Sequence, residues 1–195
     1  MDRGRESEPF DAALESPLMI EDPANCVLNT VANAMRLVMS PTSEQPPIGG
    51  GTDRVLFFAG EALPIEAFNF YRDDNECNEP FVWVRLVRRY RSKNFPAPYS
   101  GGDPCPVPVV VPVEVGIARC AAVSMGDCDG ACYESEAEIS LDDSWRIERA
   151  LCFAAGKLRQ TRCALQVGLD DIVPYGPSGN VVAWTGVLYA ELAGE

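Results

Sequence analysis

The side chains that could carry chemistry in this chain of 195 residues are limited first by what is missing. The sequence contains no histidine, so it cannot form a Ser-His or Cys-His catalytic pair or a histidine metal ligand. It also contains no P-loop, no G-x-G-x-x-G turn after a strand and no H-E-x-x-H helix. We therefore expect a protein that is not an enzyme and that holds no cofactor or metal.

The eight cysteines are the most unusual part of the composition. The closest pair, Cys128 and Cys132, is spaced C-x3-C, and a zinc site drawn from these two with Cys105 and Cys120 lacks the spacing of a ribbon or finger. Synthesis in the cytosol favours free thiols, and free cysteine is commonly buried, so we expect buried thiols, including Cys120 and Cys152. The alternative, in an extracellular particle, is a local disulfide, Cys128–Cys132 or Cys105–Cys120.

One cationic cluster stands in a chain of net charge −13. It lies along a single predicted strand and could contact DNA phosphates or an acidic patch on a neighbouring subunit. The alternative is a solvated strand face whose charges block misassembly. The strongly acidic balance argues against a general nucleic-acid binder. The candidate subunit contacts in this cluster are Arg85, Arg88, Arg89 and Arg91.

An acidic stretch from Met125 to Glu138 is interpreted as an exposed loop. Its D-x-D-G fragment is too short for an EF-hand, so contact with an adjacent copy or simple solvation is expected. A turn from Pro174 to Asn180 could present aromatic side chains to a neighbour, although a buried tryptophan beside a shaped loop is the favoured interpretation. The candidate contacts from these two stretches are Asp127, Asp129, Glu134, Glu136, Tyr175 and Trp184.

Two helices are predicted to support these residues. Asp22-Pro23 supplies an N-cap and a first-turn proline, and the apolar stripe that follows ends before Pro41. Ser140 is predicted to open a second helix. The apolar stripe of this second helix consists of Ile147, Leu151, Ala154 and Leu158, widened by Trp145, Cys152 and Ala155.

The remaining patterns predict strands. Alternation is clearest from Val109 to Cys120, and four further strands are predicted at 55–59, 81–91, 164–169 and 181–192. The element order indicates an α+β fold, with two helices packed on one face of a mainly antiparallel sheet whose edges suit a ring-forming subunit. We assign residues 1–20 to an N-terminal arm and 21–195 to a single domain. No apolar run approaches the length of a membrane span, and the first residues do not form a signal peptide.

Three stretches, in this order and spacing, resemble a known family. They are Cys77-Asn-Glu-Pro-Phe-Val-Trp-Val-Arg-Leu-Val-Arg-Arg-Tyr-Arg91, Val113-Glu-Val-Gly-Ile-Ala-Arg-Cys120, and Val173-Pro-Tyr-Gly-Pro-Ser-Gly179 with Ala183-Trp184-Thr185-Gly186. Together they cover about Cys77 to Leu192 and resemble the tail-terminator and head-to-tail neck proteins of long-tailed (siphovirus-type) actinobacteriophages. Residues 1–76 match less clearly.

The resemblance implies a structural virion protein of the tail or neck, assembled in the host cytoplasm. Six copies of a tail terminator form a ring that caps the tail tube and joins it to the neck. The implied partners are further copies of the chain, the tail tube protein and a neck, stopper or connector protein, with no membrane. Genomic DNA would pass through an acidic lumen without specific binding. The family has no catalytic residues to carry over.

Two other functions stay open at this point. The first is a head-to-tail connector or stopper of the neck, which shares the resemblance but would contact the portal side. The second is a thiol-dependent enzyme that uses the cysteines, against which the missing C-x-x-C spacing argues.

Overall fold

Two helices and seven strands make up the described part of the chain. The computed structural model describes residues 22–58, 67–68, 77, 79–122, 130–178 and 180–193. In chain order the elements are α2 (Ala24–Met39), β1 (Val55–Phe58), β2 (Phe81–Leu86), β3 (Tyr90–Arg91), β4 (Val109–Cys120), α4 (Gly130–Thr161), β5 (Ala164–Leu169), β6 (Val173–Ser178) and β7 (Val181–Leu192).

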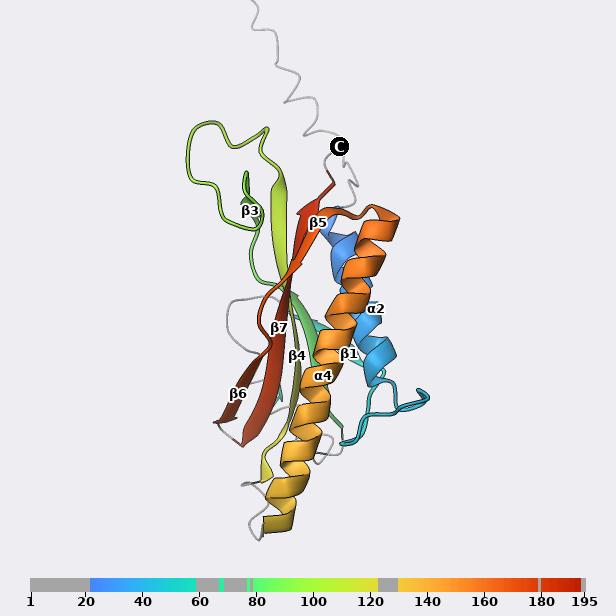
Figure 1. Cartoon of the computed structure of the whole chain (residues 1–195). Helices are drawn as coiled ribbons and strands as arrows, with labels where there is room; N and C mark the ends of the chain where they lie inside the picture. Colours follow the sequence, from blue (N-terminus) through green and yellow to red (C-terminus); the bar gives the residue numbers. More distant parts are fainter. Residues whose placement is uncertain are drawn as a thin grey trace, which may run out of the picture.

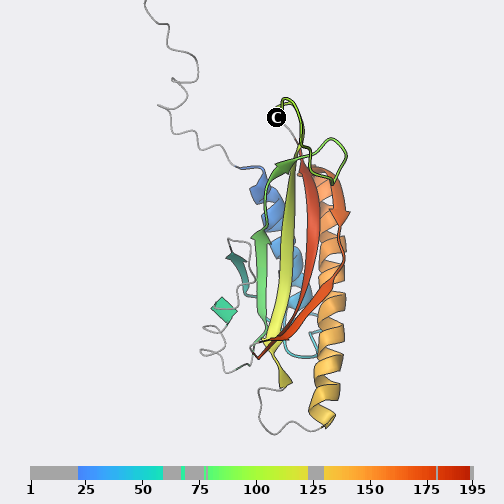
Figure 2. The ribbon, with the colours of Figure 1, turned by 90° about the vertical axis from the view of Figure 1, so that its left-hand side faces the viewer.

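The strands form one mixed sheet in the order β1-β2-β4-β7-β5, seen nearly edge-on in Figure 1 and face-on in Figure 2. β3 pairs with β4, and β6 pairs with β7. Only the β1–β2 pair is parallel among the described pairs, and all others are antiparallel. The predicted α+β fold with a mainly antiparallel sheet is therefore confirmed.

Both helices cover the same face of this sheet, as Figure 2 shows with the sheet in front of them. β4 alternates strictly, so that Val111, Val113, Val115 and Ile117 all face the helices. α2 and α4 also pack on each other. The principal apolar core therefore lies between the helix pair and the sheet, as the sequence predicts.

The opposite face of the sheet has a smaller apolar cluster. Phe81 and Trp83 of β2 lie there with Ala118 of β4 and Ala183 of β7. The indole of Trp83 lies over Gly116, where an added Cβ would come within 2.1 Å of the ring. A glycine is therefore required at this point of β4 for the tryptophan to lie flat on the sheet.

Four predicted elements are confirmed closely. β4, β5 and β7 have the predicted bounds, and α2 ends before Pro41 as expected. At the start of α2, the carboxylate of Asp22 accepts a hydrogen bond from the Ala24 N–H at 3.0 Å. This bond satisfies one of the amide donors that every helix leaves open at its first turn.

The second helix differs from its prediction. α4 begins at Gly130, so Glu134 and Glu136 lie on a helix and not in a loop. Ser140 lies inside the helix, because the preceding Glu-rich segment consists largely of helix-favouring residues and continues the turns without a break. The predicted apolar stripe is also too wide, since Trp145 is 44% exposed and Cys152 is exposed.

Two strand predictions also need correction. The predicted strand 81–91 is interrupted, because β2 ends at Leu86 and β3 contains only Tyr90 and Arg91. The predicted turn 174–180 is in large part a strand, β6, which pairs with the start of β7. Its glycine and prolines concealed the strand, and the pairing accommodates them through a register shift between Tyr175 and Ser178.

The expectation of buried free thiols is wrong. Cys26 at the start of α2 is bonded to Cys163 before β5, with a Cα–Cα distance of 6.0 Å. Cys77 is bonded to Cys120 at the end of β4, with a Cα–Cα distance of 5.8 Å. Sequence spacing could not show these pairs, because they join segments 137 and 43 residues apart.

The remaining described cysteines complete the correction. Cys132 is also disulfide-bonded, whereas Cys105 and Cys152 are free and exposed. The predicted local pair Cys105–Cys120 is therefore wrong, and Cys128 of the other predicted pair lies outside the described residues. Among the residues described, no group of three or more Cys, Asp or Glu is arranged to hold a metal ion.

Candidate assembly surface

The four arginines of the predicted basic cluster do not share one surface. Arg85 is 5% exposed and forms a bidentate pair with Glu114 on β4, with Nε–Oε1 and Nη2–Oε2 distances of 2.7 Å each. The indole N–H of Trp83 donates to the same carboxylate at 3.1 Å. Arg85 therefore anchors two central strands on the face away from the helices.

The other three arginines of the cluster have separate surroundings. Arg88 is exposed and lies 4.8 Å from the ring centroid of Tyr90. Arg89 pairs with Asp22 at 2.6 Å, and both side chains are 44% exposed. Arg91 donates to the carbonyl oxygens of the loop before β4, at Cys105 and Val107. Arg88 and Arg89 keep enough exposure for a subunit contact, whereas Arg91 serves its own loop.

The acidic candidates are divided in the same way. Glu134 is exposed on α4 and has an outward position. Glu136 is half-buried and accepts a hydrogen bond from the Ala122 N–H after β4. Asp127 and Asp129 lie outside the described residues. Of the two described residues, only Glu134 is open to a neighbouring molecule.

The two aromatic candidates are largely internal. Trp184 of β7 is half-buried against the principal core, and its indole N–H donates to Ser140 Oγ on α4 at 2.8 Å. Tyr175 of β6 packs on the smaller apolar cluster. Both side chains therefore help to hold neighbouring elements together.

The outer edges of the sheet are not among the contact sites predicted from the sequence. β1 and β5 terminate the described strand order on opposite sides, and neither strand contains a charged residue or a proline. Phe57 on β1 is 50% exposed, and Leu165 on β5 is 60% exposed. Edge strands of monomers usually carry charges, prolines or bulges that prevent pairing. β1 has none of these features, and β5 has a register shift only at its start, between Ala164 and Gln166. Both edges are therefore suited to pairing with other chains.

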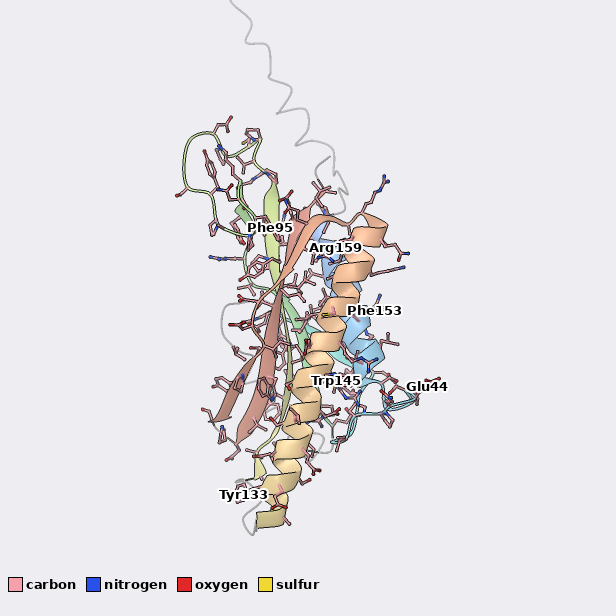
Figure 3. The ribbon with its side chains drawn as sticks, viewed as in Figure 1. Glu44, Phe95, Tyr133, Trp145, Phe153 and Arg159 are labelled. Atoms are coloured by element: carbon pink, nitrogen blue, oxygen red, sulfur yellow. A yellow bond between two sulfur atoms is a disulfide. The ribbon has the colours of Figure 1, made fainter. Side chains whose placement is uncertain are left out.

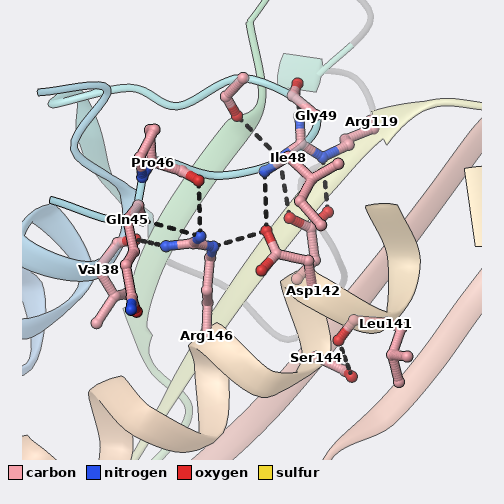
Figure 4. Close-up of polar contacts among 12 residues, drawn as sticks. Val38, Gln45, Pro46, Ile48, Gly49, Arg119, Leu141, Asp142, Ser144 and Arg146 are labelled. Atoms are coloured by element: carbon pink, nitrogen blue, oxygen red, sulfur yellow. Dashed lines mark hydrogen bonds and ion pairs between the residues drawn. The ribbon is translucent and has the colours of Figure 1, made fainter. Parts of the chain in front are cut away.

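Two arginines, the buried Arg146 of α4 and the half-buried Arg119 of β4, hold the loop of residues 41–51, as Figure 4 shows. Arg146 donates to the Val38 carbonyl at the end of α2 at 2.6 Å and to the carbonyls of Gln45 and Pro46 at 3.0 Å each. Arg119 donates to the carbonyls of Gly49 and Gly50. The loop is thereby held in one place although it contains no regular structure.

Two carboxylates of α4 complete this network. Asp142 pairs with Arg146 at 2.7 Å and accepts the Ile48 N–H at 3.0 Å. Asp143 pairs with Arg119 at 2.6 Å. Burial raises the pKa of Asp143 above its usual range, and the bond and charge of Arg119 oppose this rise.

The fixed loop lies beside an exposed apolar strip on α4. Ile48 at the loop is 65% exposed, and it lines one groove with Leu141 and Trp145, which are 72% and 44% exposed. Phe153, 56% exposed, lines a second groove with Leu37 of α2. Figure 3 shows Trp145 and Phe153 on the middle of α4, between Tyr133 and Arg159. Exposed apolar groups gathered on a fixed frame favour a protein-binding surface.

No protein-family model matches this chain, and no curated protein is significantly similar to it in sequence. Among the described helices, none combines the length and apolar character needed to cross a membrane.

Proposed function

We propose that this protein is a structural subunit of a phage neck or tail, a tail terminator whose copies form a hexameric ring. The family resemblance of three ordered stretches between Cys77 and Leu192 supports the proposal. The α+β fold agrees with the fold that this resemblance implies. The subunit would act by steric capping of the tail tube, without catalysis.

The observation that carries the proposal is the pair of uncharged sheet edges. A contact between β5 of one copy and β1 of the next joins two different surfaces, which is a heterologous contact. Repeated contacts of this kind generate a closed ring when the rotation between neighbours closes. Each contact would add main-chain hydrogen bonds and bury Phe57 and Leu165, which are exposed in the single chain.

The proposed ring fits the charge of the chain. At a net charge of −13, an acidic lumen would let DNA pass without binding. The proposed partners are the tail tube protein below the ring and a neck, stopper or connector protein above it. The proposed location is the tail or neck of the virion, after assembly in the host cytoplasm.

Disruption of the gene in the phage genome tests this role by electron microscopy of the lysate. A terminator predicts overlong tails, because nothing stops polymerisation of the tube. Tails of normal length together with heads that have lost DNA would instead identify a connector or stopper. A stable monomer with thiol–disulfide activity would replace both structural roles with an enzymatic one.

A further inference from the structure

The outward face of α4 has an ordered sequence of side chains. At steps of three or four residues, after Glu134, it presents Glu138, Leu141, Trp145, Arg149, Cys152, Gly156 and Arg159, all of them exposed. Glu148, also exposed, lies beside Arg149. The face is therefore acidic near the start of the helix, apolar in the middle and basic near the end.

Such a face is complementary to itself in the antiparallel orientation. When a twofold axis passes between Glu148 and Arg149, Glu148 faces Arg149 of the second copy. The same axis places Glu138 opposite Arg159 of the second copy, and Arg159 opposite Glu138 of the second copy. By symmetry each of these contacts occurs twice, so four ion pairs flank one apolar centre.

The apolar centre also fits under this axis. Trp145 falls opposite Cys152 of the second copy, and Leu141 falls opposite Gly156. Nothing lies within 4 Å of the position where Gly156 would carry a Cβ, so the space above it is open to a side chain of another molecule. Two helices with a small residue opposite a leucine can approach to the usual interaxial distance of about 8–10 Å.

Internal contacts leave this face exposed, although Arg159 also donates a hydrogen bond to the Val167 carbonyl of β5 at 3.0 Å. Arg149 lies 4.5 Å from the ring centroid of Trp145, which keeps the indole in place on the surface. The matched segment, from Glu138 to Arg159, extends over about 30 Å of helix. Figure 1 shows α4 as the outermost element on its side of the described structure.

We propose that the exposed face of α4 binds the same face of a second copy of this chain in the antiparallel orientation. The contact is separate from the sheet edges to which the proposed ring is attributed. It would double the number of copies in the particle: a single chain would become a dimer, and a ring of six copies would become a particle of twelve. It therefore goes beyond the proposed function and does not depend on it.

Charge reversal with rescue tests the contact in the full-length chain, by sedimentation equilibrium over a range of concentrations. The wild type should show a doubling of mass. Glu138→Arg or Arg159→Glu alone should lower the association constant on the order of 10-fold, because each charge reversal makes two of the ion pairs repulsive. The double variant Glu138→Arg/Arg159→Glu should restore the association constant to about the wild-type value. Lys157→Glu, at an exposed α4 position outside this series, is the control and should leave the doubling unchanged.

Gly156→Leu provides a second, independent test. A leucine is a better helix former than glycine, and no atom lies within 4 Å of the position of its Cβ. The melting temperature should therefore stay equal or rise while the doubling of mass is lost. A wild type that does not double in mass would overturn the proposal. It would also be overturned if the charge-swapped double variant associated no better than the single variants, or if Gly156→Leu doubled as readily as the wild type.

Discussion

At the scale of single residues, several buried or half-buried charged groups form ion pairs and hydrogen bonds that hold neighbouring elements of the described structure together. Arg85 and Glu114 connect β2 to β4, and Arg119 of β4 and Arg146 of α4 hold the loop of residues 41–51. Trp83 shares the carboxylate of Glu114. Arg85, which the sequence predicts as a surface contact, therefore stabilises the fold from inside, as do Arg119 and Arg146. Substitutions in these internal contacts are the ones that should destabilise the protein.

Removing one partner of the buried pair should be costly. Glu114→Ala removes the carboxylate that accepts two hydrogen bonds from the buried guanidinium of Arg85 and one from the Trp83 N–H. We expect a loss of about 3–5 kcal/mol in the free energy of unfolding, measured by urea titration. Glu134→Ala, on the exposed part of α4, should change it by less than about 0.5 kcal/mol. An equal effect of both variants would contradict an anchoring role for Glu114.

Asp22 should contribute a stability that depends on pH. The Ala24 N–H and then Arg89 lower the pKa of this carboxyl below its usual 3.8. The ionised form is therefore favoured in the folded state, so its contribution is present above about pH 4 and is lost as the pH falls through the lowered pKa. Asp22→Ala should cost about 1 kcal/mol at pH 7.

The pH dependence separates the role of charge at Asp22 from other effects of the substitution. Urea unfolding at pH 7 and near pH 3 should show the difference between wild type and Asp22→Ala becoming smaller at the lower pH. Asp22→Asn keeps a capping oxygen without the charge and should lie between them at pH 7. A difference of the same size at both pH values would rule out the ionised carboxylate as its source.

At the scale of elements, Arg146 converts an irregular loop into a fixed part of the α4 surface. Arg146→Ala removes the donor to three loop or helix carbonyls and leaves Asp142 without its ion pair. We expect a loss of about 3 kcal/mol and much faster cleavage of residues 41–51 by a protease of broad specificity. Lys157→Ala, at an exposed site on the same helix, should leave the cleavage rate unchanged; faster cleavage in both variants would count against a specific role for Arg146.

The elements that the sequence predicts well are those with a strong local pattern. β4 has a valine or isoleucine at every second position from Val109 to Ile117, because that side faces the principal core, and α2 is bounded by Asp22-Pro23 and Pro41. The start of α4 was missed because no capping pattern marks Gly130 and because acidic residues suit both exposed helix and loop. β6 was missed because its prolines and glycine are typical of turns.

The candidate contacts were predicted less well, since exposure depends on tertiary packing. The alternation of Trp83 and Arg85 along β2 shows that they share a face, but only the pairing with β4 places Glu114 beside them. The uncharged edges could have been found from composition, because β1 and β5 contain no charge. The position of β1 and β5 at the two ends of the strand order could not have been predicted from composition, since it depends on long-range pairing.

At the scale of the whole molecule, the disulfides join segments that are remote in sequence. Cys26–Cys163 links α2 to the junction of α4 and β5 and closes a loop of 137 residues. A cross-link of this kind restricts the unfolded chain and typically contributes about 2–4 kcal/mol. The double variant Cys26→Ser/Cys163→Ser should lose that amount in unfolding without reductant.

Cys152 provides the matched control for this disulfide, because it is free and exposed. Cys152→Ser should leave the free energy of unfolding unchanged, and added reductant should destabilise the wild type more than the double variant. If the reductant had no effect on the wild type, the Cys26–Cys163 bond would not contribute to stability in solution.

The central claim is that the uncharged edges of the sheet join copies of this chain into a ring. Light scattering coupled to size exclusion tests it directly, on the wild type and on Leu165→Lys, which places a charge on the edge of β5 where the side chain is already 60% exposed. The account predicts six copies of the 21.2 kDa chain, or twelve where α4 also pairs, and loss of the sixfold species in the variant with an unchanged circular dichroism spectrum. A wild type that remains monomeric, or a variant that keeps the ring, would contradict it.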